Sequence, residues 1–210
     1  MTHRRAKERV VRYGNEHKQA TRQRIIEMAG RRFKRDGIDG SGISALMQDV
    51  GLTNGAFYVH FTSKDNLVAT TVADQLQAQN ASIVAQAASG RAGVEQIVRW
   101  YLSAQQRDNP GDGCPSAALL DEIARCADPT KQAYTDGVLI VVDGIAARLA
   151  PDDPLSVRTR TLSAYAMMAG TLQLSRALAD RRLSDELLEQ GIHNALALLG
   201  VEHEHAMVSN

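Results

Sequence analysis

The 210-residue sequence has few aromatic residues and no long apolar run. Only 4% of the residues are Phe, Trp or Tyr, although 44% are hydrophobic, so a core must be built from Leu, Ala, Val, Ile and Met. These residue types suit packed helices better than a β-sandwich. No stretch of 18 apolar residues is long enough to span a membrane, and no apolar segment follows the basic amino terminus, as a secretory signal would require. We therefore expect an all-α cytoplasmic protein without a membrane partner.

Cysteine and catalytic motifs are also scarce. Cys114 and Cys126 are the only cysteines. If both lie on one helix, their separation of about 18 Å is too long for a disulfide, so reduced thiols are expected. The sequence contains no nucleophile elbow, no glycine-rich phosphate loop and no helical paired-histidine zinc motif. His203 and His205 could hold a metal weakly, but we expect them to lie in a disordered tail. The sequence therefore predicts no enzyme, no cofactor and no metal site.

The zero net charge conceals two parts of the chain with opposite net charge. Residues 1–64 contain 13 Lys and Arg against 6 Asp and Glu, a net charge of +7, whereas residues 65–210 contain 11 against 18, a net charge of −7. A basic first third joined to an acidic remainder is typical of a nucleic-acid-binding domain attached to a domain with another task.

Residues 42–61, GISALMQDVGLTNGAFYVHF, have the pattern of two short helices joined by a glycine turn. Apolar residues at helical spacing give the first helix one buried face, and Gly51 can adopt the left-handed conformation that ends it. Thr53 can cap a second helix from about Asn54, on which Phe57 and Phe61 face inward. Side chains on the remaining faces are free for a partner: Asn54, Ala56, Tyr58, Val59 and His60. The pattern predicts a helix-turn-helix, with an ordinary helical hairpin as the alternative.

Helical periodicity continues along the rest of the chain. About nine helices are expected in total, without internal repeats. Besides the pair above, they cover about residues 17–36, 64–88, 92–106, 116–126, 128–149, 155–179 and 184–199.

Residues 21–67 resemble the amino-terminal domain of TetR-family transcriptional regulators. TRQRIIEMAGRRF matches the first helix of that domain, and GLTNGAFYVHFTSKDNL matches its turn, its recognition helix and the start of its fourth helix. The resemblance implies base-edge contacts from Ser44 and Asn54, whereas phosphate contacts are common at Tyr58, His60 and Lys64. Two positions depart from the family pattern: Ser44 stands where many members have Arg, and Val59 where many have an aromatic residue or His. The full set of expected DNA-binding residues is Ser41, Ser44, Thr53, Asn54, Ala56, Tyr58, His60 and Lys64.

The resemblance also implies a domain plan. Residues 1–16 are expected to form a flexible basic arm, 17–63 the DNA-binding domain, 64–200 an effector-binding and dimerisation domain, and 201–210 a disordered tail. The arginines of the arm could reach an adjacent minor groove or could simply be solvated. They are Arg4, Arg5, Arg9 and Arg12.

The carboxy-terminal part resembles one branch of the same family more weakly, through GCPSAALLDEIAR, AGTLQLSRAL and LSDELLEQG. Such domains bind ligands and form dimers through their last two helices. The expected dimer residues are Leu162, Ala166, Ala169, Gly170, Leu188 and Leu196, although a helix buried within one chain would have the same pattern. The expected effector-pocket residues are Trp100, Tyr101, Cys114, Tyr134, Tyr165 and Met168, for which plain core packing is the alternative.

Cys114 precedes an expected helix start, where the helix dipole favours a thiolate. A redox role is one interpretation, and a small buried hydrophobic side chain is the other. The resemblance as a whole implies a homodimeric repressor that binds an inverted-repeat operator in double-stranded DNA and is released by a small-molecule effector. A helical adaptor protein, or a redox sensor or enzyme based on Cys114, is the alternative. The sequence names neither operator nor effector, and it does not separate activation from repression.

Overall fold

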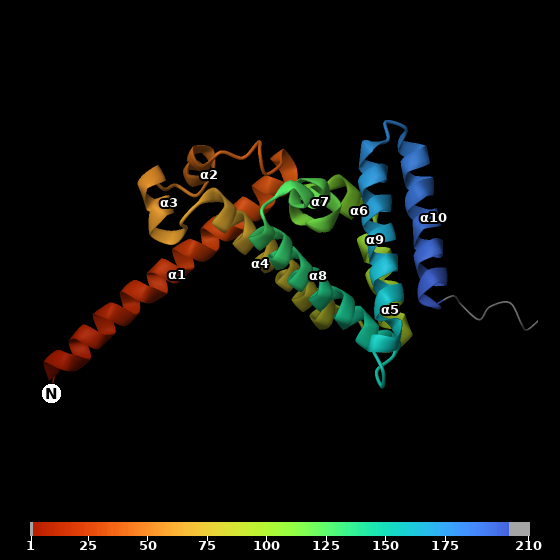
Figure 1. Ribbon diagram of the computed structural model, residues 1–210, viewed down its shortest axis with the longest axis horizontal. Helices are drawn as coiled ribbons and strands as arrows, with labels where there is room; N and C mark the ends of the chain where they lie inside the picture. The colour runs from red at the N-terminus through yellow and green to blue at the C-terminus, as the bar shows by residue number, and fades with distance from the viewer. Residues whose placement is uncertain (1, 202–210) are drawn as a thin grey trace, which may run out of the picture.

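The computed structural model describes residues 2–201, with side chains from Asn15 onward, and this part of the chain is helical without strands (Figure 1). The predicted all-α class is confirmed. In order, the elements are α1 (Thr2–Asp36), α2 (Ile43–Asp49), α3 (Asn54–His60), α4 (Lys64–Gln86), α5 (Gly90–Tyr101), α6 (Ala104–Asp108), the 3-10 helix η1 (Pro110–Asp112), α7 (Ser116–Arg125), α8 (Asp128–Leu149), α9 (Leu155–Ala177) and α10 (Arg181–Leu199).

The structure differs from the sequence-based expectation at both ends of the chain. The helix predicted from about His17 begins at Thr2, so the backbone of the expected flexible arm is helical. This segment contains no proline and one glycine, and Arg, Lys, Glu and Ala favour helix. The side chains of its arginines lie outside the described part of the chain. The expected tail also lies outside it, with His203 and His205, except for Val201, which is buried.

Two boundaries in the middle of the chain also differ. The helix expected over residues 92–106 is divided into α5 and α6, because Ser103 caps α6 by accepting a hydrogen bond from the backbone N–H of Gln106. The helix expected from Ser184 begins at Arg181, because the carboxylate of Asp180 accepts hydrogen bonds from the N–H groups of Arg182 and Leu183. Both differences follow from capping side chains, which satisfy backbone donors at a helix start.

The helices form an elongated arrangement with the helix-turn-helix near one end and the α9–α10 pair at the other (Figure 1). α4 leaves the amino-terminal unit and packs along α8, while α7, α6 and η1 lie between α1 and α9. One apolar core runs through the whole arrangement, from Ile25 and Phe33 on α1 to Leu76 on α4 and Leu172 on α9. The amino-terminal helices are therefore packed onto the bundle rather than tethered to it.

Two negative findings apply to the described residues. None of their helices is both long and apolar enough to cross a membrane. Nor do these residues bring together three or more His, Cys, Asp or Glu side chains that could hold a metal ion.

Candidate nucleic-acid interface

The turn between α2 and α3 has the geometry that the sequence predicts. Gly51 has a φ of +71°, in the left-handed region that favours glycine. The backbone N–H of Gly51 donates to Gln48 O at 3.0 Å and that of Leu52 donates to Met47 O at 2.9 Å, which closes the end of α2. α3 is anchored by Phe57 and Phe61, which are both buried with their ring centroids 5.6 Å apart. The recognition helix is thus fixed from its inner face.

Two arginine side chains of α1 contact the C-terminal end of α2. Arg24 donates from Nη2 to the carbonyl oxygen of Val50 at 3.1 Å, at the end of α2. Arg32 forms an ion pair with Asp49, also at the end of α2. A cation at a helix C-terminus is favourable because the last carbonyl groups carry partial negative charge. These contacts orient α2, and through it α3, against α1.

The outer face of α3 is apolar and aromatic, yet it is not covered. Tyr58 is 68% exposed and Val59 is 58% exposed. Thr53 is the residue before α3, and its hydroxyl makes no capping hydrogen bond to the helix. A helical hairpin that served only to fold the chain would not need these residues at its surface. The exposed face therefore favours a helix-turn-helix that contacts a partner.

The structure places most of the expected DNA-binding residues around this face. Tyr58 stands out from α3, Ala56 packs partly against the core, and Ser41 does not reach the surface. Ser41 is only 1% exposed, and its Oγ donates to the carbonyl oxygen of Gly37 at 2.7 Å, so this assignment is wrong. The sequence pattern could not reveal that this hydroxyl closes a loop. The exposed members are Ser44, Thr53, Asn54 and Tyr58, and the half-buried ones are Ala56, His60 and Lys64.

Two basic residues of α1 that the sequence analysis did not assign to the site lie near His60. Burial lowers the pKa of His60 below its usual value, and the charges of Lys18 and Arg22 lower this pKa further. The imidazole is therefore neutral at pH 7, and its buried Nδ1 has no hydrogen-bond partner among the described residues. The guanidinium of Arg22 lies 4.9 Å from the ring centroid of Phe61. Helical spacing from Ile25 and Ile26 back to positions 22 and 18 was the signal that could have found both residues.

Lys64 begins α4 beside Ser63, whose hydroxyl caps the helix by accepting the N–H of Asn66 at 3.1 Å. Lys64 also lines a crevice of about 320 Å³ with Asp39 and Glu122. The lysine thus sits where the helix-turn-helix meets α7, and its expected phosphate contact stays a prediction.

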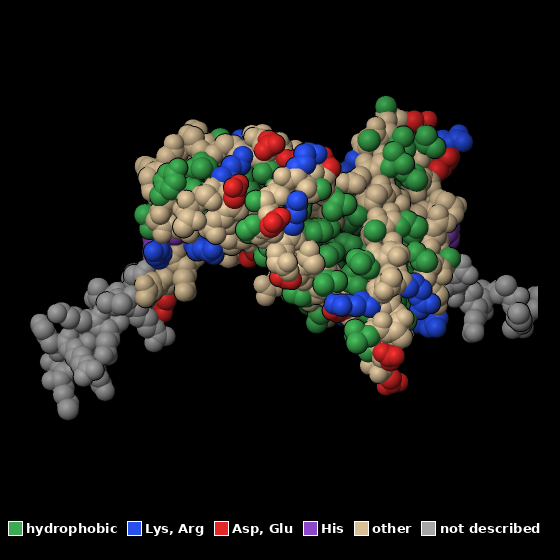
Figure 2. Space-filling view, viewed as in Figure 1, with side chains coloured by type: hydrophobic (Ala, Val, Ile, Leu, Met, Phe, Trp, Pro, Cys, Tyr) green, Lys and Arg blue, Asp and Glu red, His purple; other side chains and the backbone are tan. Residues whose placement is uncertain are grey.

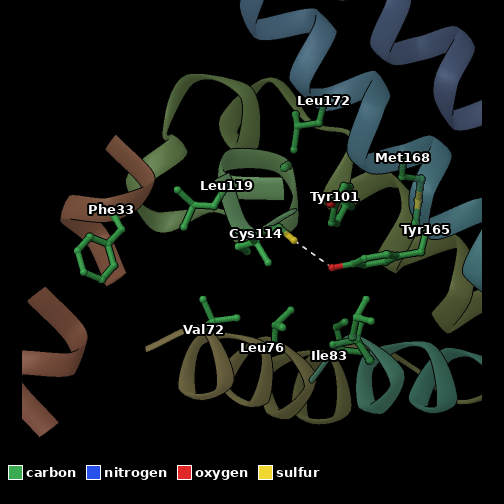
Figure 3. Packing of buried hydrophobic residues seen from close by; sticks show 14 of the residues in the cluster. Phe33, Val72, Leu76, Ile83, Tyr101, Cys114, Leu119, Tyr165, Met168 and Leu172 are labelled. Carbon is green, nitrogen blue, oxygen red and sulfur yellow. Dashed lines mark hydrogen bonds between the residues drawn. The ribbon is translucent and has the colours of Figure 1, made fainter. Parts of the chain in front are cut away.

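The expected pocket residues divide into a cluster and one outlier. The OH of Tyr165 lies 3.1 Å from Sγ of Cys114 (Figure 3). It also lies 2.9 Å from Oγ of Ser116, and Tyr134 donates to that Oγ at 3.0 Å. The rings of Tyr101 and Tyr165 are 5.8 Å apart, and burial raises the pKa of both phenols well above the usual value.

Ser116 joins this cluster although the sequence analysis did not assign it, and Met168 lies beside Tyr165 (Figure 3). Cys114 itself is buried, which agrees with its interpretation as a small core side chain. Trp100 lies apart from the cluster, because it lines a separate groove of about 200 Å³ between α4 and α5.

The expected dimer residues also divide into two groups. Leu162, Ala166 and Gly170 are exposed along one face of α9. The other three are buried within the single chain, so they are not available at a free surface. They are Ala169, Leu188 and Leu196. Four further apolar residues of α9 and α10, which the sequence analysis missed, are exposed: Leu155, Leu174, Leu183 and Leu198.

The comparison with protein families agrees with this geometry. Residues 25–71 match the family model for bacterial regulatory proteins of the tetR family. The match begins at the buried part of α1, continues through α2 and α3, and ends within α4. The chain carries a tetR-family amino-terminal domain. A comparison with curated protein sequences finds no match.

Solved structures of TetR-family regulators share the fold over most of the chain. A TetR-family transcriptional regulator from Agrobacterium tumefaciens is 18% identical with a TM-score of 0.67, and the alignment covers 84% of this chain and 98% of that one. A TetR-family regulator from Cytophaga hutchinsonii is 22% identical with a TM-score of 0.64, over 88% and 95% of the two chains. FadR from Bacillus subtilis, solved in complex with stearoyl-CoA, is 14% identical with a TM-score of 0.63, over 86% and 99%. The chain thus has the fold of TetR-family transcriptional regulators.

Proposed function

We propose that this protein is a TetR-like transcriptional regulator that binds operator DNA and is released from it by a small-molecule effector, and so acts as a repressor. The observation that carries the proposal is the uncovered outer face of α3. Tyr58 and Val59 are exposed there on a helix whose other face is locked into the core by Phe57 and Phe61. A rigid helix with an exposed outer face is what reading a DNA groove requires.

Charge supports DNA as the partner. Residues 1–64 carry a net charge of +7, and Lys18 and Arg22 stand beside the recognition helix. Basic groups bind backbone phosphates and release counterions, whereas base edges are read by hydrogen bonds. Asn54 is exposed at the start of α3, where its amide can form two hydrogen bonds with an adenine. In the proposed complex Asn54 reads sequence, whereas Tyr58 and Lys64 hold phosphates.

The proposed functional unit is a homodimer. A recognition helix of seven residues contacts few base pairs, so specificity needs two copies on an inverted repeat. The exposed apolar face of α9 and α10 is the proposed dimer surface, and hydrophobic side chains are visible at the surface of these helices (Figure 2). Gly170 lies on this face, and apart from its chain neighbours and the backbone of its own helix no described atom lies within 4 Å of the position that a Cβ would occupy, so a partner helix can approach closely there.

The proposed effector site is the hydroxyl-rich cluster inside the bundle. Tyr101, Tyr134, Tyr165 and Ser116 provide hydroxyl groups, and the OH of Tyr101 has no hydrogen-bond partner among the described residues. These groups are uncharged at neutral pH and surrounded by apolar side chains, an environment that suits a largely apolar ligand with a few hydrogen-bonding atoms. FadR, which shares the fold, was solved with stearoyl-CoA, and this supports a largely apolar small molecule as the proposed effector. We propose no catalytic step for this protein, which would act in the cytoplasm.

A mobility-shift assay on the DNA upstream of the protein's own coding region tests the proposal. We expect binding to a discrete segment that contains an inverted repeat, with half-sites about 34 Å or a multiple of it apart. Affinity should fall with salt, with a log–log slope of about −0.9 for each phosphate contacted. Binding that does not depend on salt, or that is absent at low salt, would instead favour an adaptor that binds protein alone.

A further inference from the structure

The carboxylate of Glu122 on α7 holds the loop that leads from α1 into the helix-turn-helix. Its Oε2 accepts hydrogen bonds from the backbone N–H groups of Ile38, at 2.7 Å, and Asp39, at 3.3 Å. Gly37 has a φ of +82°, and a Cβ at this position would lie 3.1 Å from Oε1 of Glu122, so the backbone approaches the carboxylate closely. A charged acceptor makes stronger hydrogen bonds with backbone N–H groups than a neutral one does. The loop before α2 therefore depends on a side chain from the bundle.

Lys34 makes a second connection close to the end of α1. Its Nζ donates to the carbonyl oxygen of Gly113 at 2.9 Å and to Oε1 of Gln75 at 2.6 Å. The lysine is buried, so these contacts replace its lost hydration. Gly113 lies just before α7 and Glu122 lies near the end of α7. The segment from 113 to 122 is therefore bound at both of its ends to the DNA-reading unit, by which we mean α1 to α3 with their loops.

The same segment is bound to the interior of the bundle from its other side. Cys114 and Ser116 both contact the phenol of Tyr165 on α9, as Figure 3 shows for Cys114. Arg176, also on α9, donates from Nη1 to the carbonyl oxygen of Ala117 at 2.6 Å. A change at the tyrosine cluster therefore acts directly on the first turn of α7.

We propose that α7 relays such changes to the DNA-reading unit, and that Glu122 is the positioning residue at the receiving end. α7 has ten residues, is about 15 Å long, and is packed through buried Leu119 and Ile123, so it moves as a body. α4 is the covalent route between the two parts of the chain, because it follows α3 directly and packs along α8 of the bundle. The relay is a second route, made of noncovalent contacts, and it rests on the proposed DNA-binding function.

Thermodynamic linkage makes the relay testable without an effector. If a structural change around Cys114 weakens DNA binding, then bound DNA must make that structural change less favourable by the same free energy. Cys114 is buried, so its thiol reacts only when the surrounding structure opens. DNA that holds the reading unit against α7 should therefore slow the reaction of this thiol.

The experiment measures the rate at which DTNB modifies Cys114 in the full chain carrying Cys126→Ala, so that one thiol remains. Rates are compared with and without a saturating duplex that the mobility-shift assay has shown to bind. We expect DNA to slow the reaction by about fivefold or more, the lower end of typical coupling. In Glu122→Ala the rates with and without DNA should be nearly equal, although DNA still binds. In Glu122→Gln, whose amide oxygen can accept hydrogen bonds from the same N–H groups, DNA should still slow the reaction, but less than in the protein with Glu122. Asp121→Ala is the matched control, because Asp121 is exposed on α7 and pairs only with Arg125 among the described residues.

The relay would be overturned if DNA slowed the DTNB reaction equally in Glu122→Ala and in its parent, the Cys126→Ala protein. It would also be overturned if DNA left the reaction rate of Cys114 in the parent unchanged. A parent that binds no DNA at all defeats the proposed function at an earlier step and removes the relay with it. If Glu122→Ala does not fold, hydrogen exchange decides on the parent protein. Modification of Cys114 should then speed exchange of the Ile38 and Asp39 amides, and unchanged exchange overturns the proposal.

Discussion

At the scale of single residues, the proposal assigns base reading to some side chains of the interface and phosphate binding to others. Asn54 is exposed at the first position of α3, whereas Thr53 occupies the capping position without a capping hydrogen bond. Asn54→Ala should therefore reduce the preference for operator over random DNA by about 1 to 3 kcal/mol, because alanine cannot form the bidentate pair with adenine. Competition binding with the two duplexes measures this ratio. A lower melting temperature with an intact ratio would show that Asn54 is only a structural residue of the turn.

Lys34 should make stability depend on pH in the alkaline range. Burial lowers its pKa from 10.5 to about 8, so between these values the unfolded chain binds more protons at this position than the folded chain. The contribution of Lys34 to the free energy of unfolding therefore increases as pH rises from about 8 toward 10.5. This contribution is lost as pH falls back through about 8, where the lysine is protonated in the folded chain as well. Urea unfolding at pH 7.5 and 9.5 should show the wild type gaining about 1 to 2 kcal/mol relative to Lys34→Met. A difference that is constant over this range would contradict the assignment.

At the scale of secondary structure elements, the amino-terminal part of α1 should add bonds to DNA phosphates. The buried part of α1 begins at Ile25, and its backbone stays helical back to Thr2. Residues 2–14 contain four Arg and one Lys against one Glu. Deleting them should weaken binding to operator and random duplexes alike and make the salt slope shallower by about 0.9 for each phosphate that the shortened protein no longer neutralises. Arg182→Gln, a surface change on α10, should leave the slope unchanged, and equal slopes for the deletion and the wild type would assign no DNA-binding role to this segment.

Helices whose boundaries are marked by nearby residues could be predicted well from the sequence. α2, α3, α4, α7 and α8 begin at or within a residue of the expected positions, because glycine, proline and apolar spacing mark their ends. Contacts between distant segments could not be predicted. Nothing around Ser41 indicates that its hydroxyl closes a loop, and nothing around Glu122 indicates that it binds the N–H groups of Ile38 and Asp39. Likewise, helical spacing identifies two faces of α9 but does not say which of them the rest of the chain covers.

At the scale of the whole molecule, that last ambiguity determines which substitutions test the dimer. Ala169 is 1% exposed inside the chain, whereas Leu155 is 73% exposed and Leu174 is 52% exposed on the outer side of α9. A charge at position 169 would be buried without a partner and should unfold the monomer, so it says nothing about assembly.

Leu174→Glu is the informative change, because it places a charge at an apolar interface while the monomer keeps its core. We expect it to shift sedimentation from dimer to monomer and to weaken operator binding strongly, since one helix-turn-helix alone holds half of the inverted repeat. Its melting temperature, extrapolated to low protein concentration where dimers dissociate, should match that of the wild type. Ile140→Glu is the matched control, since Ile140 is an exposed apolar residue on α8 rather than on the α9–α10 face. A Leu174→Glu protein that remains a dimer with full operator affinity would place the dimer surface elsewhere on the bundle.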